Sequence, residues 1–575
     1  MGILLEDAAM PLVREVARPE PGLRGRVLAS ILFVVAGVAV VMILFPWKQK
    51  SGIEESRHGQ LVGVEAFDAA CSATLYPSVC VETLLPNYRA HSTSSKGLTE
   101  ILISSASRGV ARTLAAVLAN RGVSRIGFWG ERVCHSTLVS STEQLEASLA
   151  AMNSTHPRFD DIKMRISAAM EFHTTCIDAL METRALEAHT VATKQHTEKL
   201  LSNALAFVIA LSRFGNSVDS WQSILKSPSF LSPSMDEPKP WISREQQEEL
   251  MLDDPPIDVV VAKDGSGLFK SIQAAIDAAP KTGNATAKRY VIRIKAGVYN
   301  EQITVSKKAT NFMFIGDGAE KTIITGNKSV ALTPGMTTFL SASLIVEGTG
   351  FIGKAFTARN TAGAAGHQAV AMRVSADMAA FYQCSFDGYQ DTLYTHTFRQ
   401  FYRETTVSGT VDFIFGNAAV AFQSCTLVAK KSTLPGQQNT YTAQGRTDPG
   451  QITGMSFQSC TFDATPELKA SAGAFKTYLG RPWKAYSTHV NLKCNLLEHI
   501  DPAGWLPWNT SDFGLRTSFF AEWKDFGPGA ATAKRAWWSK QITDASVAGK
   551  FQAVPFTQAD QWVPATSIPL TTSLP

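Results

Sequence analysis

Residues 381–425 read FYQCSFDGYQDTLYTHTFRQFYRETTVSGTVDFIFGNAAVAFQSC, and a short aromatic pattern recurs within them. Phe381-Tyr-Gln-Cys, Phe401-Tyr-Arg-Glu and Phe422-Gln-Ser-Cys follow one another at nearly equal spacing, and Phe457-Gln-Ser-Cys returns later. A short repeat of this kind, with short strands and no crossover helices, is typical of a solenoid of stacked β coils. Because equivalent side chains then lie about 4.8 Å apart on neighbouring coils, the recurring Phe predicts an internal aromatic ladder.

Short strands are also predicted upstream of this repeat. Runs rich in β-branched and aromatic residues, separated by Gly and Asn turns, stand at 290–294 (YVIRI), 311–315 (NFMFI) and 321–324 (KTII). The sequence therefore predicts an all-β solenoid from about residue 257 to residue 570.

Four polar side chains are spaced by one coil of this solenoid. The separation of Gln368 from Gln390, and that of Asp391 from Asp412, each match the spacing of the aromatic repeat. Adjacent coils would bring the members of each pair together, so two amides and two carboxylates are predicted to share one patch of the wall. Because neighbouring residues of a regular strand face opposite sides, Gln390 and Asp391 can both face that patch only at a bend.

The two carboxylates determine the chemistry of this patch. Two close carboxyl groups do not easily both ionise, so the pKa of one is raised. The protonated one can act as an acid while its charged partner acts as nucleophile or base, and the amides can stabilise an oxyanion. Arg481 can keep the second carboxylate ionised, and Trp483 offers a flat face to a sugar ring.

Each of these residues also has a purely structural interpretation. Asp391 and Asp412 can be turn or capping residues, and Gln368 can join a side-chain ladder. Arg481 can form a surface ion pair, and Trp483 can belong to the core. Spacing alone leaves both interpretations open.

A helical region precedes the solenoid. Residues 61–224 carry apolar residues at helical spacing, and short breaks divide them into several helices, as in an antiparallel bundle. Residues 225–256, rich in Pro, Ser and acidic residues, are predicted to be a linker. The helical region contains four cysteines, which allow three pairings: Cys71, Cys80, Cys134 and Cys176.

An apolar segment stands near the N-terminus. Residues 27–45 (VLASILFVVAGVAVVMILF) contain no charge or amide and would span about 28 Å as a helix. We expect a transmembrane signal-anchor that follows a cytoplasmic tail at 1–26; a buried helix of a soluble protein is the alternative. Export of the remainder is favoured by the cysteines and by four candidate glycosylation sites at Asn153, Asn284, Asn327 and Asn509.

Charge is distributed unevenly along the chain. Residues 257–575 hold 30 Lys and Arg against 22 Asp and Glu, while the rest holds 24 against 28. This difference suggests a polyanionic partner for the basic half and a contact between the halves, although an asymmetry without purpose explains it equally well. The β-rich half has no Cys/His cluster with metal-ligand spacing, so we expect no metal. It has no Gly-x-Ser-x-Gly motif, so we expect no serine nucleophile, and we expect no other cofactor.

Five separated motifs in the β-rich half look like the signature segments of plant pectin methylesterases, in the family's order: 297–301 (GVYNE), 368–370 (QAV), 390–393 (QDTL), 412–416 (DFIFG) and 479–483 (LGRPW). The resemblance covers about residues 257–570. It implies a right-handed parallel β-helix that hydrolyses the methyl esters of homogalacturonan to pectate and methanol in the plant cell wall. Neither a cofactor nor a nucleic acid partner is implied.

The resemblance also implies a role for each motif residue. Asp412 matches the family's nucleophile and Asp391 its general acid/base. Gln368 and Gln390 match its transition-state stabilisers. Its substrate contacts are matched by Thr338, Gln368, Arg481 and Trp483.

The helical region is similar to the pectin methylesterase inhibitor domain, a four-helix bundle. That resemblance implies the disulfides Cys71–Cys80 and Cys134–Cys176. It also implies that the solenoid binds either its own inhibitor-like domain or separate inhibitor proteins.

Two departures from the family pattern stand out. Related chains carry a basic processing motif before the β-rich half, whereas this chain reads QQEELM at 246–251, with only Arg244 nearby. We therefore expect that release of the β-rich half by the usual protease is impaired. Many relatives also have a cysteine where Thr405 stands, so Cys425 is expected to lack that disulfide.

Rival functions remain at this point. A polygalacturonase would use two acids about 6.5–9.5 Å apart, and a pectate lyase would use calcium-binding carboxylates. The pairing of Gln390 with Asp391 argues against both. A third possibility is a binding protein in which the bundle acts as inhibitor or retention module and the β-rich half is silent.

Overall fold

The computed structural model describes residues 70–87, 94–119, 127–185, 188–215, 221, 256–280, 288–471 and 474–574. The predicted membrane segment at 27–45, all but the last residue of the predicted linker, and Asn284 lie outside these ranges. The other three candidate glycosylation sites, Asn153, Asn327 and Asn509, are exposed, so glycosylation there stays a prediction.

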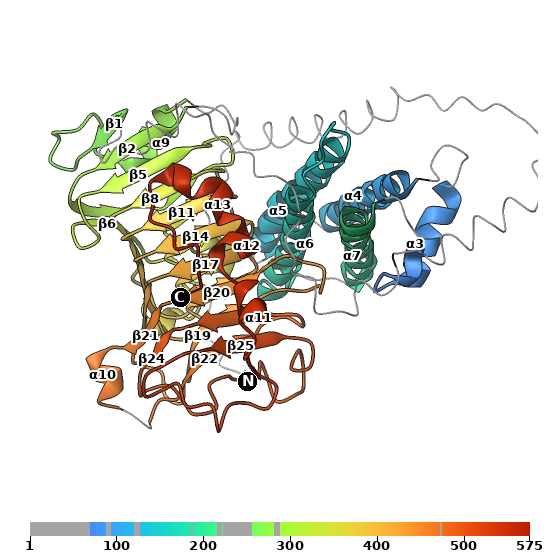
Figure 1. Cartoon of the computed structure of the whole chain (residues 1–575). Helices are drawn as coiled ribbons and strands as arrows, with labels where there is room; N and C mark the ends of the chain where they lie inside the picture. The colour runs from blue at the N-terminus through green and yellow to red at the C-terminus, as the bar shows by residue number, and fades with distance from the viewer. Residues whose placement is uncertain are drawn as a thin grey trace, which may run out of the picture. The chain divides into compact units, whose positions relative to one another are not determined.

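Helices make up the N-terminal part. After α3 (Pro77–Leu84) and the short 3-10 helix η1 (Leu85–Asn87) come four long helices that pack around one apolar core (Figure 1). These four, which we call the helical bundle, are α4 (Ser95–Ala119), α5 (Gly127–Met152), α6 (Phe159–Glu182) and α7 (Ala188–Phe214). Helix α6 carries Asp160 and Asp161 in its first turn, where the free backbone N–H groups favour negative charge.

Two disulfides stabilise this part. Cys71–Cys80 ties α3 to the residues before it, and Cys134–Cys176 joins α5 to α6. These are the pairs that the family resemblance implies. Among the described residues, α4 is the one helix long and apolar enough to cross a membrane. Its apolar residues Leu102, Val110 and Val117 are buried in the bundle core, which accounts for that composition.

The part after residue 256 is a parallel β-helix of three sheets (Figure 1). The first sheet contains β1 (Val259–Val261), β2 (Tyr290–Ile294), β5 (Phe312–Gly316), β8 (Ile352–Lys354), β11 (Ala379–Tyr382), β14 (Arg399–Arg403), β17 (Ala419–Gln423), β20 (Gly454–Gln458), β23 (Thr488–Leu492), β25 (Phe519–Trp523) and β26 (Lys540–Gln541).

The second sheet, which carries the candidate site, contains β4 (Ile303–Val305), β7 (Leu344–Val346), β10 (Met372–Val374), β13 (Leu393–Thr395), β16 (Ile414–Gly416), β19 (Asn439–Gln444) and β22 (Thr477–Pro482). The third contains β3 (Gly297–Asn300), β6 (Thr322–Gly326), β9 (Thr357–Asn360), β12 (Ser385–Asp387), β15 (Thr406–Gly409), β18 (Thr426–Ala429), β21 (Thr461–Ala464) and β24 (Asn495–Leu496). One coil takes a strand from each sheet in turn, as β11, β12 and β13 do before β14 begins the next.

An aromatic ladder fills the interior, but one of its predicted members is wrong. Phe381 pairs in register with Tyr402, not with Phe401, and the rings of Phe381, Tyr402, Phe422 and Phe457 stack at successive centroid distances of 5.0, 4.7 and 4.7 Å. Because a shift of one residue moves a strand side chain to the other face, Phe401 points out of the coil. It packs instead in the apolar cluster that contains Trp562.

Short helices cover the outer surfaces of the coils. After the last strand of the first sheet the chain forms four short helices: α11 (Ala545–Gly549), α12 (Ala553–Thr557), α13 (Ala559–Trp562) and η7 (Pro564–Thr566). Helices α12 and α13, the latter with Trp562, pack on the outer face of the first sheet (Figure 1). At the N-terminal end of the β-helix, the buried residues of α9 (Ile272–Ala278) pack into the interior core. The Glu301 carboxylate accepts hydrogen bonds from the N–H groups of Ile272 and Gln273, so the last residue of the GVYNE motif caps a helix.

Thr405 interrupts a column of buried cysteines. Strand register stacks Cys384, Thr405, Cys425, Cys460 and Cys494 on consecutive coils. Within the described residues the four cysteines of this column are free thiols.

Candidate active site

The predicted patch assembles where the chain enters the second sheet. Leu393 of β13 pairs with Ile414 of β16, so Asp391 and Asp412 occupy equivalent places on adjacent coils. Gln390 lies in the same coil as Asp391, and Gln368 lies one coil earlier; the two glutamines form a parallel bridge. All four side chains line one cleft, as their separation by one coil predicts, together with Thr338, Arg481 and Trp483.

A bend allows Gln390 and Asp391 to face the same cleft. Asp391 has a φ of 63° and Asp412 a φ of 50°, both in the left-handed region that side chains other than glycine rarely adopt. The condition set by strand alternation is therefore met. Both aspartates have strained backbones, as do residues away from the cleft such as Gln383 and Ser424.

The surroundings of the two carboxylates differ. Asp412 receives both arms of Arg481: Nε donates to Oδ1 at 2.8 Å and Nη2 to Oδ2 at 2.6 Å. Burial, then the charge of Asp412 and then that of Glu182, raise the pKa of Asp391 well above its usual range, while Arg481 opposes the shift. Asp391 can therefore hold a proton beside a charged Asp412, and the pair can supply an acid and a nucleophile together.

Aromatic rings form the walls of the cleft. Trp483 packs edge-on against Phe415 at 6.0 Å, and the guanidinium of Arg481 lies 4.4 Å from the ring centre of Trp508. Trp508 was not predicted from the sequence. The aromatic run WLPW at 505–508 is the signal that could have found it.

Helix α6 of the bundle also lines this cleft, through Thr175, Asp178, Ala179 and Glu182. The hydroxyl and the N–H of Thr338, in η5 (Thr338–Leu340), both donate to the Glu182 carboxylate, at 2.7 and 3.0 Å. Lys484, next to Trp483, pairs with Asp178 at 2.9 Å. Sequence reasoning gave no role to these bundle residues.

The Glu182 carboxylate is shielded from water although the residue as a whole is exposed. Burial of this carboxylate raises the pKa of Glu182 to about 7, while the two bonds from Thr338 oppose the shift. A predicted substrate contact is thus occupied by an acid of the same chain.

A second, buried network joins α6 to the β-helix nearby. Asn417 donates to the Glu171 carboxylate at 2.9 Å, and the Thr175 hydroxyl lies 2.8 Å from Nε2 of His396. Burial raises the pKa of Glu171 to about 8 and lowers the pKa of His396 well below its usual value. Neutral forms of both groups are therefore favoured where α6 meets the β-helix.

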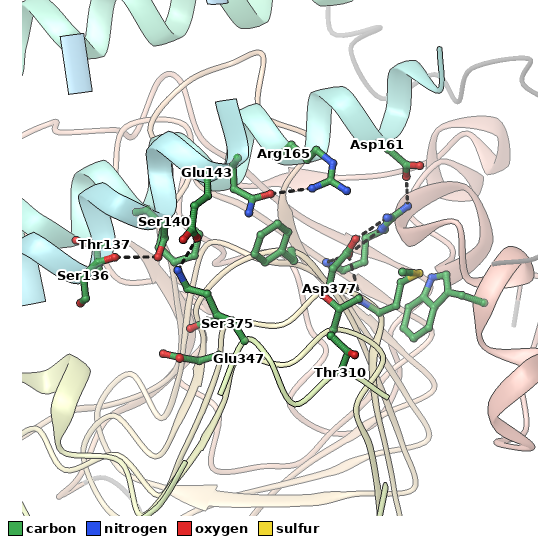
Figure 2. A pocket seen from close by; sticks show the side chains of 18 of the residues that line it. Ser136, Thr137, Ser140, Glu143, Asp161, Arg165, Thr310, Glu347, Ser375 and Asp377 are labelled. Atoms are coloured by element: carbon green, nitrogen blue, oxygen red, sulfur yellow. Dashed lines mark hydrogen bonds and ion pairs between the residues drawn. The ribbon is translucent and has the colours of Figure 1, made fainter. Parts of the chain in front are cut away.

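A cavity of about 480 Å³ lies beyond this network, between α5, α6 and the coil ends (Figure 2). Two ion pairs cross between the bundle and the β-helix here: Arg399 meets Asp161 at 2.9 Å, and Lys307 meets Glu143 at 2.7 Å. Arg399 also meets Asp377 of the β-helix itself, at 2.6 Å. The two crossing pairs attach the bundle to the solenoid. The acidic partners come largely from the bundle and the basic ones from the β-helix, in agreement with the uneven charge of the sequence.

Comparisons with known proteins agree with both parts of this arrangement. A family model described as Pectinesterase matches residues 258–560, and one described as Plant invertase/pectin methylesterase inhibitor matches residues 65–207. "Pectinesterase 1" of Citrus sinensis is 38% identical over 527 residues, covering 88% of this chain and 88% of that relative. "Pectinesterase/pectinesterase inhibitor U1" of Solanum lycopersicum is 35% identical over 570 residues, covering 95% of this chain and 96% of that relative.

A solved structure extends the likeness to the β-helix by itself. A pectin methylesterase from carrot is 47% identical and superposes with a TM-score of 0.54, over 56% of this chain and 98% of the carrot chain. The matched share is about the size of the β-helix, which takes up slightly more than half of this chain.

Proposed function

This chain belongs to the pectinesterase family, and we propose that it hydrolyses the methyl esters of homogalacturonan with Asp412 as nucleophile and Asp391 as acid and base. The observation that carries the proposal is the contrast between the two stacked carboxylates. Both oxygens of Asp412 accept from the Arg481 guanidinium, while burial favours the protonated form of Asp391.

The reaction proceeds in two halves. Asp412 attacks the C6 carbonyl of a methyl galacturonate unit, and the amides of Gln368 and Gln390 donate to the oxyanion. Asp391 gives its proton to the departing methoxide, so methanol leaves and an acyl-enzyme anhydride remains. The Asp391 carboxylate then takes a proton from water, whose oxygen attacks the anhydride. Pectate and free Asp412 result.

The substrate contacts fit a sugar polymer. Trp483 and Trp508 offer aromatic faces beside the carboxylates, and Thr338 offers an N–H and a hydroxyl. An inverting polygalacturonase would separate its two acids to admit a water, whereas Asp391 and Asp412 stand on adjacent coils. The described residues also contain no group of three or more metal-ligating side chains for a calcium-dependent lyase.

The test is methanol release from esterified pectin by residues 257–575. Asp412→Asn should lower the rate by at least about a thousandfold, since the nucleophile is lost. Asp463→Asn, which alters an acid paired with Lys469 outside the cleft, should leave the rate unchanged. Release of methanol at the parent rate by Asp412→Asn would overturn the assignment. New reducing ends or unsaturated products in its place would indicate one of the rival activities.

We propose a second function for the bundle, as an inhibitor of its own catalytic half. Support comes from Glu182, whose carboxylate occupies the donors of Thr338, and from Asp178, which holds Lys484 beside Trp483. The whole chain should release methanol at least about tenfold more slowly than residues 257–575. While the bundle is docked, the cleft is open to substrate in only a small fraction of the molecules. Equal rates would show that the bundle leaves the cleft accessible.

The remaining sequence predictions concern export. We propose that residues 27–45 anchor the chain in the membrane of the secretory pathway and that the solenoid acts in the cell wall. We also propose that residues 61–224 and 257–570 are separate domains, joined by the linker at 225–256. Because residues 246–251 lack the basic processing motif, we expect the two domains to stay joined. Mass analysis of the exported form would detect cleavage at either place.

A further inference from the structure

A hydroxyl outside the cleft contacts the proposed nucleophile. Thr440 of β19 is fully buried and stands one coil beyond Asp412, because Ile414 pairs with Thr442 in the register of β16 and β19. Its Oγ1 accepts the backbone N–H of Asp412 at 2.9 Å and donates to Oδ1 of the same residue at 2.6 Å. The sequence offered no motif that pointed to this residue.

The direction of this hydrogen bond is determined by the hydroxyl having a single proton. Since the N–H of Asp412 donates to Oγ1, the hydroxyl proton is free to point at Oδ1. Oδ1 then accepts from Thr440 and from Nε of Arg481, while Oδ2 accepts from Nη2 of Arg481. The two oxygens of one carboxylate are therefore unequal, and Oδ2 keeps more of its lone-pair density.

We propose that Thr440 is a positioning residue that fixes the carboxylate plane of Asp412 and leaves Oδ2 as the attacking atom. The inference rests on the proposed role of Asp412. Thr440 also holds the backbone N–H of a residue whose φ is 50°, so one side chain supports both the strained turn and the carboxylate. Thr440 is not among the residues that line the cleft, so it acts through Asp412.

The test compares Thr440→Val and Thr440→Ser in residues 257–575, which contain an apolar core of their own and correspond to the carrot chain. Thr440→Val should lower kcat about 10- to 100-fold and leave KM within about twofold, because an attacking geometry is lost while the cleft is intact. Thr440→Ser keeps the hydroxyl and should restore kcat to within about threefold of the parent.

Thr442→Val is the matched control. Thr442 is also a buried threonine of β19, but its hydroxyl bonds to Leu479 and His489, away from Asp412. Both valine variants should lower Tm by similar amounts, while only Thr440→Val should lose kcat. A kcat for Thr440→Val within about twofold of the parent, or an equal loss in Thr442→Val, would overturn the inference. If Asp412→Asn is as active as the parent, the proposed function fails; if it is inactive while Thr440→Val is not impaired, only the inference about Thr440 fails.

Discussion

Two aspartates with the same side chain acquire different properties from their neighbours. Both are nearly buried, with 7% of Asp391 and 5% of Asp412 exposed. Asp412 has a guanidinium on both oxygens, whereas burial and the charge of Asp412 raise the pKa of Asp391. The different roles proposed for the two carboxylates therefore depend on Arg481 at Asp412 and on burial at Asp391.

Replacing Arg481 by Gln should lower kcat/KM by about a hundredfold or more, because the buried carboxylate loses the cation that pairs with it. Arg481→Lys should recover only part of the rate, since an ammonium cannot bond both oxygens in the plane of the carboxylate. Methanol release by residues 257–575 measures both, with Arg403→Gln, which alters a pair with the exposed Glu404, as the control. Full activity in Arg481→Lys would indicate that charge alone is enough.

At the scale of the element, α6 joins the two parts of the chain. Its outer face carries Phe172, which packs on Phe398, and Ala179, which enters the apolar cluster beside Trp483. The disulfide Cys134–Cys176 secures this helix to α5. Because burial raises the pKa of its acid Glu171, we expect the docking to depend on pH.

The sign of that pH dependence follows from the raised pKa. The pKa of Glu171 is about 8 when the bundle is docked, against 4.5 for a free glutamate side chain. Below the lower of these values it is protonated in both states, so docking is strongest there; as the pH rises toward the upper value, ionisation increasingly favours the undocked state. Glu182, whose pKa burial raises to about 7, acts in the same direction.

The rate of the whole chain relative to that of residues 257–575 should therefore rise at least about threefold between about pH 5 and pH 8. Glu171→Gln cannot ionise and should reduce this rise to the part that Glu182 contributes. Methanol release at each pH measures both effects. A ratio that does not change with pH in the parent would contradict the assignment of Glu171 as the sensitive group.

For the whole molecule, the uneven charge of the sequence becomes a set of ion pairs between bundle and solenoid. Lys484 with Asp178 and Lys307 with Glu143 are partly exposed, so salt screens them. Raising the ionic strength to about 0.5 M should increase the rate of the whole chain about two- to fivefold relative to residues 257–575. Asp178→Asn should reproduce part of this increase at low salt, whereas Glu146→Gln, an exposed acid of α5, should not. Salt that affects both proteins equally would indicate an effect on the substrate alone.

The sequence was enough to predict those parts of the molecule that depend on the repeat. The length of one coil was enough to stack Asp391 on Asp412, because neighbouring coils pair in strict register. It was not enough to separate Phe401 from Tyr402, since one position along a strand decides which face a side chain takes. The docking of α6 joins segments that are far apart in the chain. The bond from Thr440 to Asp412 spans 28 residues, a coil longer than the repeat, so the regular spacing did not reveal it.

The second sheet sets a limit on which parts of the chain can vary. The residues from Gln368 to Arg481 come from five consecutive coils, those of β10, β13, β16, β19 and β22. Each coil touches only its neighbours, so the chemistry needs this central block and is indifferent to the outermost turns. The rate of methanol release therefore reports whether the middle coils of the solenoid are folded. Local unfolding or sequence change at the outermost coils should leave that rate unchanged.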